Sequence, residues 1–87
     1  MHVILVYDFG EKRVGKMLRL CRKFLFRIQN SVFEGDISDI KLKELLKKAR
    51  TFMNKEEDSI ILFKYPSSVR IDKEIIGKEC GFTDIFL

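Results

Sequence analysis

Runs of apolar residues along the chain predict strands at three places. His2 to Tyr7 is an almost unbroken β-branched and aliphatic run, which is typical of a central strand buried on both faces. Ser59 to Tyr65 is a second buried apolar run, and a proline ends it. The segment from Arg27 to Ser38 mixes β-branched, aromatic and polar residues, so it indicates two short strands joined by a bend at Asn30-Ser31 or Gly35.

Two segments between these runs repeat their apolar residues at helical spacing. The first extends from Glu11 to about Phe26, and the second follows Ser38 or Asp39, either of which can cap its amino terminus. Asn54 is expected to end the second helix in the left-handed conformation. The apolar face of the first helix consists of Val14, Met17, Leu18, Cys21 and Leu25, and that of the second consists of Leu42, Leu45, Leu46, Ala49 and Met53.

The order strand, helix, two strands, helix, strand predicts a ferredoxin-like βαββαβ sandwich, an α/β (α+β) fold with both helices on one face of the sheet. A chain of 87 residues forms a single domain, residues 1–87. The minimal fold ends at Pro66, yet Val69 to Ile76 alternates like a strand and Phe82 to Leu87 is apolar. We therefore expect segment 66–87 to supply an extra C-terminal strand that pairs with a partner protomer at a dimer interface.

Composition places the chain among globular proteins, with 46% hydrophobic and 34% charged residues. The longest apolar run is far shorter than the roughly 18 residues of a membrane span, and the chain shows no signal peptide. We therefore expect a cytoplasmic protein with no membrane partner. Cys21 and Cys80 have neither the spacing of a zinc site nor that of a disulfide framework, so both are expected to be buried thiols.

Basic residues are concentrated at the start of the chain. Residues 1–30 hold seven Lys or Arg against two acidic residues, whereas residues 31–87 hold ten against eleven. A basic stripe falls opposite the apolar face of the first helix and consists of Lys12, Lys16, Arg19, Lys23 and Arg27, flanked by Arg13 and Arg22. This stripe predicts sequence-independent contact with nucleic-acid phosphates, and the alternative is a solvated helix face.

Asp8 directly follows the first apolar run, where α/β folds often present ligand-binding and catalytic groups. The sequence Asp8-Phe9-Gly10-Glu11 also fits an Asp-x-x-Glu capping box, in which Asp8 accepts hydrogen bonds from the backbone of the first helix. The spacing by itself favours the cap. Phe33 is similarly ambiguous, since it either stacks on a base or completes the core.

Three features together resemble the CRISPR-associated protein two family. They are Tyr7-Asp8 at the end of the first strand, the block Arg27-Ile28-Gln29-Asn30-Ser31-Val32-Phe33-Glu34-Gly35, and Asp58-Ser59 at the start of the late apolar strand. The long block is the specific one, and the resemblance covers essentially the whole chain. It implies a ferredoxin-like homodimer that acts in spacer acquisition, the adaptation stage of CRISPR antiviral defence, with the adaptation integrase as a partner.

The resemblance also implies a metal-dependent endonuclease that acts on RNA or DNA. Asp8 would be its catalytic and metal-binding residue, facing its twin across the dimer axis and holding Mg²⁺ or Mn²⁺. Tyr7 and Glu11 are the only nearby candidates for a general base. Two alternatives stay open: a non-catalytic dimeric scaffold that binds duplex DNA and bridges integrase dimers, and a toxin-like ribonuclease of similar size and fold.

The remaining residues that the resemblance assigns lie around the basic helix and the signature block. Arg13, Arg27 and Phe33 are implied to contact nucleic acid, together with the stripe described above. Gln29 and Ser31 are implied to hold the bend between the two short strands.

Overall fold

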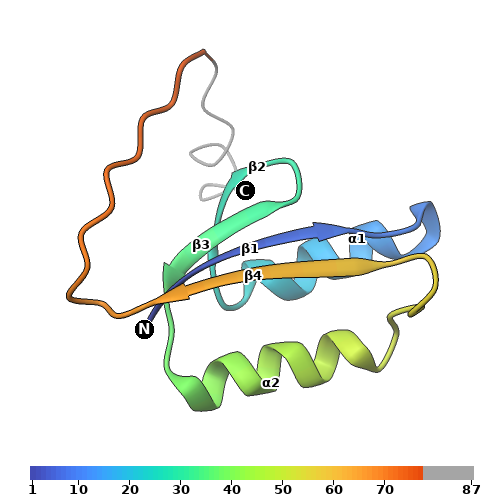
Figure 1. Cartoon of the computed structure of the whole chain (residues 1–87). Helices are drawn as coiled ribbons and strands as arrows, with labels where there is room; N and C mark the ends of the chain where they lie inside the picture. Colours follow the sequence, from blue (N-terminus) through green and yellow to red (C-terminus); the bar gives the residue numbers. More distant parts are fainter. Residues whose placement is uncertain (78–87) are drawn as a thin grey trace.

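The computed structural model describes residues 1–77 and contains two helices and four strands (Figure 1). In chain order these are β1 (His2–Asp8), α1 (Glu11–Arg22), β2 (Phe26–Gln29), β3 (Val32–Asp36), α2 (Asp39–Arg50) and β4 (Ser59–Tyr65). The predicted βαββαβ order is confirmed. The predicted pair of short strands is present, and the turn between them contains Asn30, whose φ of 40° is left-handed.

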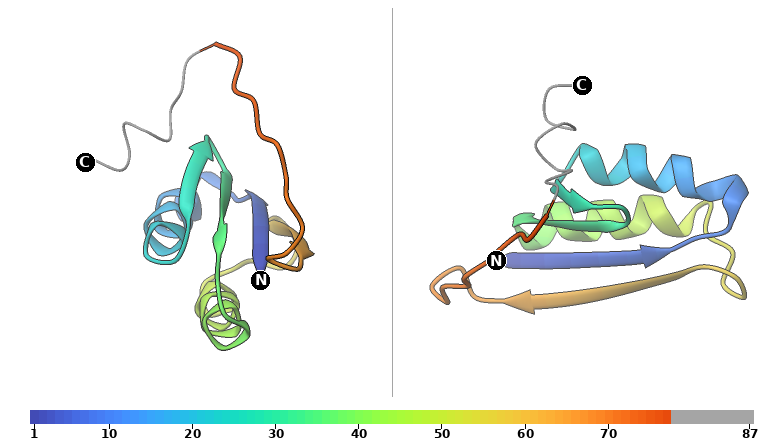
Figure 2. Two further views of the ribbon diagram at one scale, coloured as in Figure 1. Left: turned by 90° about the vertical axis from the view of Figure 1, so that its left-hand side faces the viewer. Right: turned by 90° about the horizontal axis from the view of Figure 1, so that it is seen from above.

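The strands form one antiparallel sheet in the order β2-β3-β1-β4, which places β1 between β3 and β4. In this register, Ile4 lies between Glu34 of β3 and Phe63 of β4. Both helices cover one face of the sheet (Figure 2). We call the other side, which has no helix within residues 1–77, the open face. This is the ferredoxin-like sandwich that the sequence predicted.

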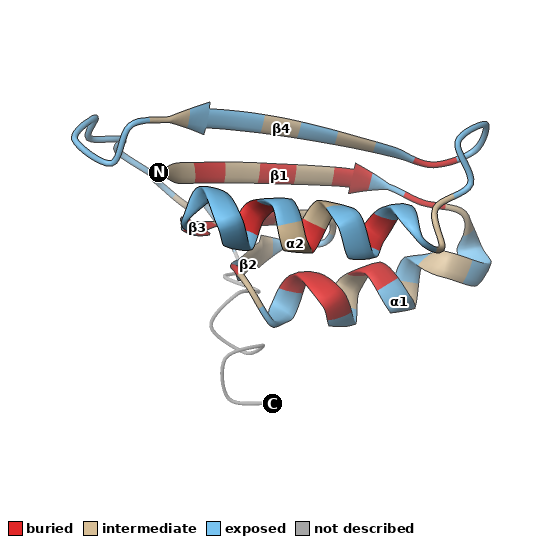
Figure 3. Ribbon diagram, turned by 90° about the horizontal axis from the view of Figure 1, so that it is seen from below, coloured by how far each residue is buried: buried red, intermediate tan, exposed pale blue. Residues whose placement is uncertain are grey.

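The core lies between the sheet and the two helices (Figure 3). Its buried apolar residues are Val3, Leu5, Tyr7, Phe9, Met17, Leu20, Cys21, Leu25, Phe33, Ile37, Leu42, Leu45 and Ala49. Along β1 only every second residue is buried, because side chains alternate between the two faces and the helices cover only one of them. The prediction that this strand is buried on both faces is therefore wrong for the single chain.

β4 is an edge strand whose Ile60 and Leu62 pack against the core, so the predicted burial of this run is confirmed on the helix face and wrong on the other face of the single chain. Ile61 and Phe63 are 54% and 53% exposed. They pair with Val6 and Ile4 of β1, and residues directly opposite each other in a sheet share a face. These four residues, Ile4, Val6, Ile61 and Phe63, form an apolar patch on the open face, which we call the open-face patch.

α1 begins without a side-chain cap. Gly10 occupies the N-cap position, and no side chain there accepts a hydrogen bond from the first turn. The predicted capping box is wrong because β1 continues through Asp8, which pairs with Ser59 of β4. α1 also ends at Arg22, before the predicted Phe26, because Phe26 is the first residue of β2.

α2 begins as predicted, since the hydroxyl of Ser38 accepts a hydrogen bond from the backbone N–H of Lys41 at 3.2 Å. It ends at Arg50, and the following residue, Thr51, is right-handed. Asn54 does not adopt a left-handed conformation, so that prediction is wrong; its carbonyl instead accepts the N–H of Asp58 at 2.8 Å in the turn before β4. Within residues 1–77, neither helix is long and apolar enough to cross a bilayer.

Residues 66–77 pass over the open face (Figure 2). A cavity of about 400 Å³ separates part of this segment from the sheet, and Lys73 forms an ion pair with Glu34 of β3. The strand predicted for Val69 to Ile76 is not formed in the single chain, because no strand within residues 1–77 pairs with it. Phe82 to Leu87 and Cys80 lie outside the described residues.

Candidate metal and nucleic-acid site

Asp8 lies at the very end of β1, with its side chain exposed. Because it alternates with Ile4 and Val6, it lies on the open face, in register with Ser59 of β4. Within residues 1–77, its carboxylate makes no hydrogen bond or ion pair. Asp8 is therefore an unengaged carboxylate at one end of the open-face patch.

The two residues after Asp8 are held in place by packing and by a hydrogen bond. Phe9 is buried, with its ring centroid 5.6 Å from that of Tyr7 and 6.2 Å from that of Phe52. The backbone N–H of Gly10 donates to a carboxylate oxygen of Asp58 at 2.7 Å. The backbone around Asp8 is thus fixed by its pairing with β4 on one side and by this buried loop on the other.

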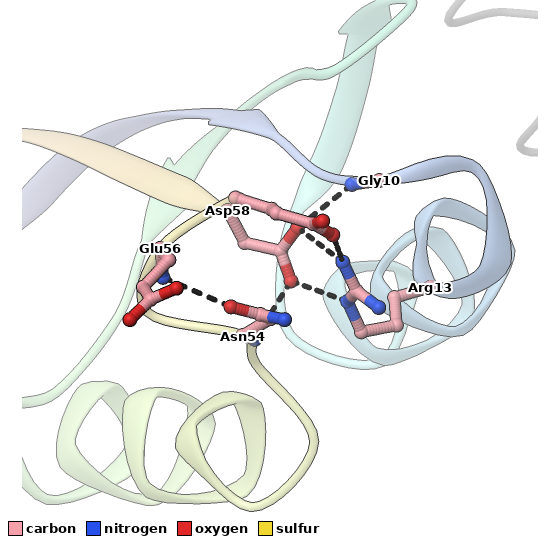
Figure 4. A network of polar contacts seen from close by, with 6 residues as sticks. Gly10, Arg13, Asn54, Glu56 and Asp58 are labelled. Carbon is pink, nitrogen blue, oxygen red and sulfur yellow. Dashed lines mark hydrogen bonds and ion pairs between the residues drawn. The ribbon is translucent and has the colours of Figure 1, made fainter.

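Asp58 is the centre of a polar network that joins the start of α1 to the turn before β4 (Figure 4). Its side chain is fully buried and accepts hydrogen bonds from Gly10 N–H, from Asn54 N–H at 2.8 Å and from Arg13 Nε at 2.6 Å. The Nη2 atom of Arg13 adds a bond to Glu57 at 2.8 Å. We call Gly10, Arg13, Asn54 and Asp58 the Asp58 clamp.

Charge and hydrogen bonding stabilise the ionised carboxylate in this clamp. The hydrogen bond from Arg13 is the largest cause that holds the pKa of Asp58 well below its usual range, and the two backbone N–H donors act in the same direction. Its two carboxylate partners in turn raise the pKa of Arg13. A β-carbon at Gly10 would come within 2.5 Å of Arg13 Nη2, so glycine leaves room for the guanidinium.

Sequence reasoning assigned Arg13 to nucleic acid and gave Asp58 no role of its own. In the structure, the guanidinium of Arg13 is engaged with two carboxylates, and it holds the loop that follows Asp8. The one local signal for Asp58 was its position directly before an apolar strand, since a charged residue that is buried there must be paired. Its partner lies 45 residues away, which no local pattern could indicate.

One chain does not provide a complete metal site within residues 1–77, because no group of three or more His, Cys, Asp or Glu side chains is placed to hold an ion. Asp8 is a single carboxylate. Mg²⁺, however, keeps most of its water ligands and is typically bound by one or two carboxylates together with substrate phosphates. Asp8 therefore fits half of a magnesium site, and a second copy of the chain would have to supply the other half.

The two candidates for a general base differ in their surroundings. Tyr7 is 3% exposed, and burial raises the pKa of its hydroxyl above the ordinary value, which makes it a poor base near neutral pH. Its hydroxyl is also hydrogen-bonded to Ser31. Glu11 is exposed in the first turn of α1. Of these two candidates, only Glu11 is accessible to water.

The basic stripe and Asp8 lie on opposite sides of the sheet. Lys12, Lys16, Arg19 and Lys23 are exposed on or just after α1, in the helix layer, whereas Asp8 is on the open face. Arg27 is on β2, where its Nε atom donates to the carbonyl of Asn30 at 2.9 Å. The residues that the sequence grouped as one nucleic-acid site are therefore divided by the sheet within a single chain.

The signature block mainly builds the β2–β3 turn and the core. Gln29 and Ser31 flank the left-handed Asn30, and the carbonyl of Ser31 accepts the N–H of Tyr7 at 3.1 Å. Phe33 is 0% exposed and stacks on the ring of Tyr7 with centroids 6.2 Å apart. Phe33 cannot stack on a base from this position, so the core interpretation is the correct one.

Comparison with known proteins identifies relatives along most of the chain. A sequence model of the family described as CRISPR associated protein Cas2 matches residues 1–70. The CRISPR-associated endoribonuclease Cas2 of Dictyoglomus turgidum is 39% identical over 79 residues, which cover 91% of each chain. The protein with the same description from Thermotoga maritima is 40% identical over 81 residues, which cover 93% of each chain.

Solved structures have the same fold. A crystal structure described as cas2 matches with a TM-score of 0.81 at 37% sequence identity, covering 91% of this chain and 88% of that one. A Cas2 structure from Streptococcus pyogenes matches with a TM-score of 0.77 at 24% identity, covering 88% of this chain and all of the other, and at that identity it supports the fold alone.

Proposed function

The chain belongs to the CRISPR-associated Cas2 family, and from this premise we propose that it is a metal-dependent endoribonuclease that acts as a homodimer in CRISPR adaptation. The names of its relatives favour RNA as the substrate that is cleaved. Adaptation, with the integrase as partner, follows from the family resemblance.

The homodimer is supported by the open face. The open-face patch leaves two large side chains, Ile61 and Phe63, about half exposed beside the central strand. A chain of this size buries a modest share of its surface when folded alone, so covering this patch would add stability. A second copy packed against the open face would cover it, and segment 66–87 would lie at the same interface.

Asp8 carries the proposal, because within residues 1–77 it is an exposed carboxylate without a partner, on the face where a second copy would pack. Two copies related by a twofold axis near this end of β1 would bring both Asp8 side chains to one place. They would hold the divalent ion, which when bound neutralises the scissile phosphate and favours ionisation of an attacking water. The Asp58 clamp keeps the backbone after Asp8 fixed, which limits the positions that the carboxylate can reach.

The deciding experiment compares Asp8→Asn with wild type on a single-stranded RNA in Mg²⁺ and in Mn²⁺. Asn keeps the size of the side chain but not its charge, so we expect cleavage to fall by at least about 100-fold while circular dichroism and dimer mass stay unchanged. Asp39→Asn, at an exposed acid in the first turn of α2, is the matched control and should cleave like wild type. Wild-type cleavage rates in the Asp8 variant would rule out the metal mechanism.

A specific observation favours the second candidate, the non-catalytic scaffold that binds duplex DNA and bridges integrase dimers. A single carboxylate per chain within residues 1–77, on the side of the sheet away from the helices and their basic stripe, is a sparse catalytic site. If wild type and Asp8→Asn are equally inert on RNA and on DNA but still form dimers and bind duplex, the scaffold is the function.

A further inference from the structure

Polar residues lie at both ends of the apolar row that β1 and β4 present on the open face. The two inner cross-strand pairs make up the open-face patch. The outer pairs carry polar groups and are His2 with Tyr65 at one end and Asp8 with Ser59 at the other. Asp8 lies beyond the residues of β1 that pair with β3, so Ser59 is its only cross-strand neighbour within residues 1–77.

Asp58 and Ser59 are consecutive residues in very different surroundings. Asp58 is buried, and its carboxylate points toward Gly10 and Arg13 (Figure 4). Ser59 is exposed and lies on the open face opposite Asp8. Within residues 1–77, the hydroxyl of Ser59 makes no hydrogen bond. Asp58-Ser59 is one of the three features by which the chain resembles its family, and the Asp58 clamp accounts for the first of these two residues only.

The Asp58 clamp fixes both strands just beyond the pair of Asp8 and Ser59. Gly10, two residues after Asp8, donates its N–H to the carboxylate of Asp58 at 2.7 Å, and Asp58 directly precedes Ser59. Phe9, between Asp8 and Gly10, is buried in the core. The end of an edge strand is otherwise among the first parts of a sheet to open. The clamp therefore holds the two backbones at a fixed separation while both side chains stay exposed.

We propose that Ser59 is a positioning residue for Asp8, whose hydroxyl donates a hydrogen bond to one carboxylate oxygen of Asp8 and leaves the other oxygen for the divalent ion. Directly opposite residues of an antiparallel sheet have Cβ atoms roughly 5 Å apart. Rotation of the two side chains between ordinary rotamers brings a hydroxyl within hydrogen-bonding distance of a carboxylate at that separation. This inference rests on the proposed function, because it concerns the ion that Asp8 is proposed to hold.

A hydroxyl suits this position because of its hydrogen-bonding groups and its lack of charge. An ionised carboxylate only accepts hydrogen bonds, and a serine hydroxyl can donate one. A lysine or arginine here would compete with a bound cation, whereas serine leaves the negative charge of Asp8 available. Groups that hydrogen-bond to a ligating carboxylate orient it, and their loss typically lowers metal affinity by about 10- to 100-fold. The effect matters most where each chain offers a single carboxylate.

The test measures the binding of Mn²⁺ to the full chain by electron paramagnetic resonance of the free ion, a readout that does not depend on cleavage. Ser59→Ala removes the hydroxyl, and Ser59→Thr keeps it on a side chain that strands favour. The matched control is Ser68→Ala, at an exposed serine after β4. Dimer mass and the Tm without metal are measured for each variant, and both should match wild type because the two serines are exposed.

We expect Ser59→Ala to bind Mn²⁺ about 10-fold more weakly than wild type, and Ser59→Thr and Ser68→Ala to bind it like wild type. In the cleavage of single-stranded RNA, Ser59→Ala should raise the Mg²⁺ concentration for half-maximal rate by a similar factor. The rate at saturating Mg²⁺ should stay within about twofold of wild type. A merely structural role of Ser59 would instead change Tm and leave the dependence on metal as it is in wild type.

The outcomes separate this inference from the proposed function. If Ser59→Ala binds Mn²⁺ like wild type while Asp8→Asn loses binding, the role of Ser59 is overturned and the metal site at Asp8 stands. If Ser59→Thr binds as weakly as Ser59→Ala, the hydroxyl is not the cause and the role is overturned as well. Unchanged binding in Asp8→Asn would overturn the proposed metal site itself, and the role of Ser59 with it.

Discussion

The two faces of the sheet differ in how far their apolar side chains are buried. On the helix face, Val3, Leu5 and Phe33 are fully buried, and the strands within residues 1–77 leave no large hydrophobic side chain exposed on that side. On the open face, Ile61 and Phe63 stay more than half exposed, and Lys73 forms its ion pair with Glu34 from a segment without regular structure. The helix face is covered within the chain, whereas the open face keeps large apolar side chains exposed within residues 1–77.

The two faces also differ in the charged groups that they carry. The helix layer carries most of the positive charge, and the open face carries Asp8 beside an apolar patch. A cation surface needs water and a polyanion, while a paired carboxylate needs a second copy. The sheet therefore separates the cations of the helices from the proposed metal ligand on the open face.

The difference in packing between the two faces should have its largest effect on the free energy of unfolding. Phe33→Ala removes a fully buried ring from the helix face and should lower the free energy of unfolding by about 3–5 kcal/mol, a large part of the total for a small domain. Phe26→Ala, at a ring that is 63% exposed, should cost about 1 kcal/mol or less. Urea unfolding followed by circular dichroism measures both. Similar losses in the two variants would remove the contrast between the faces.

Assembly should depend on the open face alone. Ile61→Glu places a charge in the open-face patch and should weaken the dimer by about 100-fold without unfolding the chain. Ile40→Glu is the matched control, because Ile40 is also exposed, at 79%, but lies on α2 in the helix layer. Sedimentation velocity over a range of concentrations gives both association constants. A dimer weakened by the control and unaffected by Ile61→Glu would place the interface on the other side.

The Asp58 clamp should contribute stability that acid removes. Asp58→Asn leaves Arg13 without its buried partner and should lower Tm by roughly 10 °C at pH 7. Folding lowers the pKa of Asp58, so this contribution is fully present above the unfolded value, near 4, and is lost as the pH falls through the lower folded value. The difference in Tm between wild type and variant should therefore begin to shrink below about pH 4 and go on shrinking as the pH falls further. A Tm difference that stays constant down to pH 2 would show that the ionised clamp is not its source.

The smallest effect concerns Cys21, which is fully buried under the helix face. Burial raises the pKa of its thiol to about 12, against about 8.5 in an unfolded chain. Its contribution is present below pH 8.5 and is lost as the pH rises toward the folded value, so wild type should lose about 2 kcal/mol between pH 8.5 and 10 that Cys21→Ala does not. Cys21→Ala itself should cost about 1–2 kcal/mol at pH 7. Parallel pH dependence in the two proteins would mean that the thiol ionises freely in the folded state.

The sequence predicted the order of helices and strands well, because each of them depends on the spacing of apolar residues that are close together in the chain. The apolar run of Ser59 to Tyr65 coincides with β4, and the cap at Ser38 depends on a residue only three positions away. The errors came where two local patterns competed. The spacing at Asp8 predicted a capping box, but Asp8 pairs with Ser59 of β4 instead. This pairing extends β1 to Asp8, so Asp8 does not cap α1.

The candidate site was predicted in part. Asp8 was found from its place after an apolar strand and from the family resemblance, and it stays the proposed metal ligand. Phe33 could not be assigned from its polar neighbours, because only the alternation of β3 against the helices decides that it faces the core. Asp58 could be noticed only from its position before the last strand, and its partners Gly10 and Arg13 are more than 40 residues away.

The sequence by itself determined the helices, the strands and the acid at the end of the first strand, because each depends on residues close together in the chain. Only the tertiary structure decided which surface each charge belongs to. It placed the cations of α2 beside those of α1, put Asp8 on the opposite side and joined Arg13 to Asp58. The reason is that surface and burial depend on which elements pack together, and packing is a property of the sheet order rather than of any one segment.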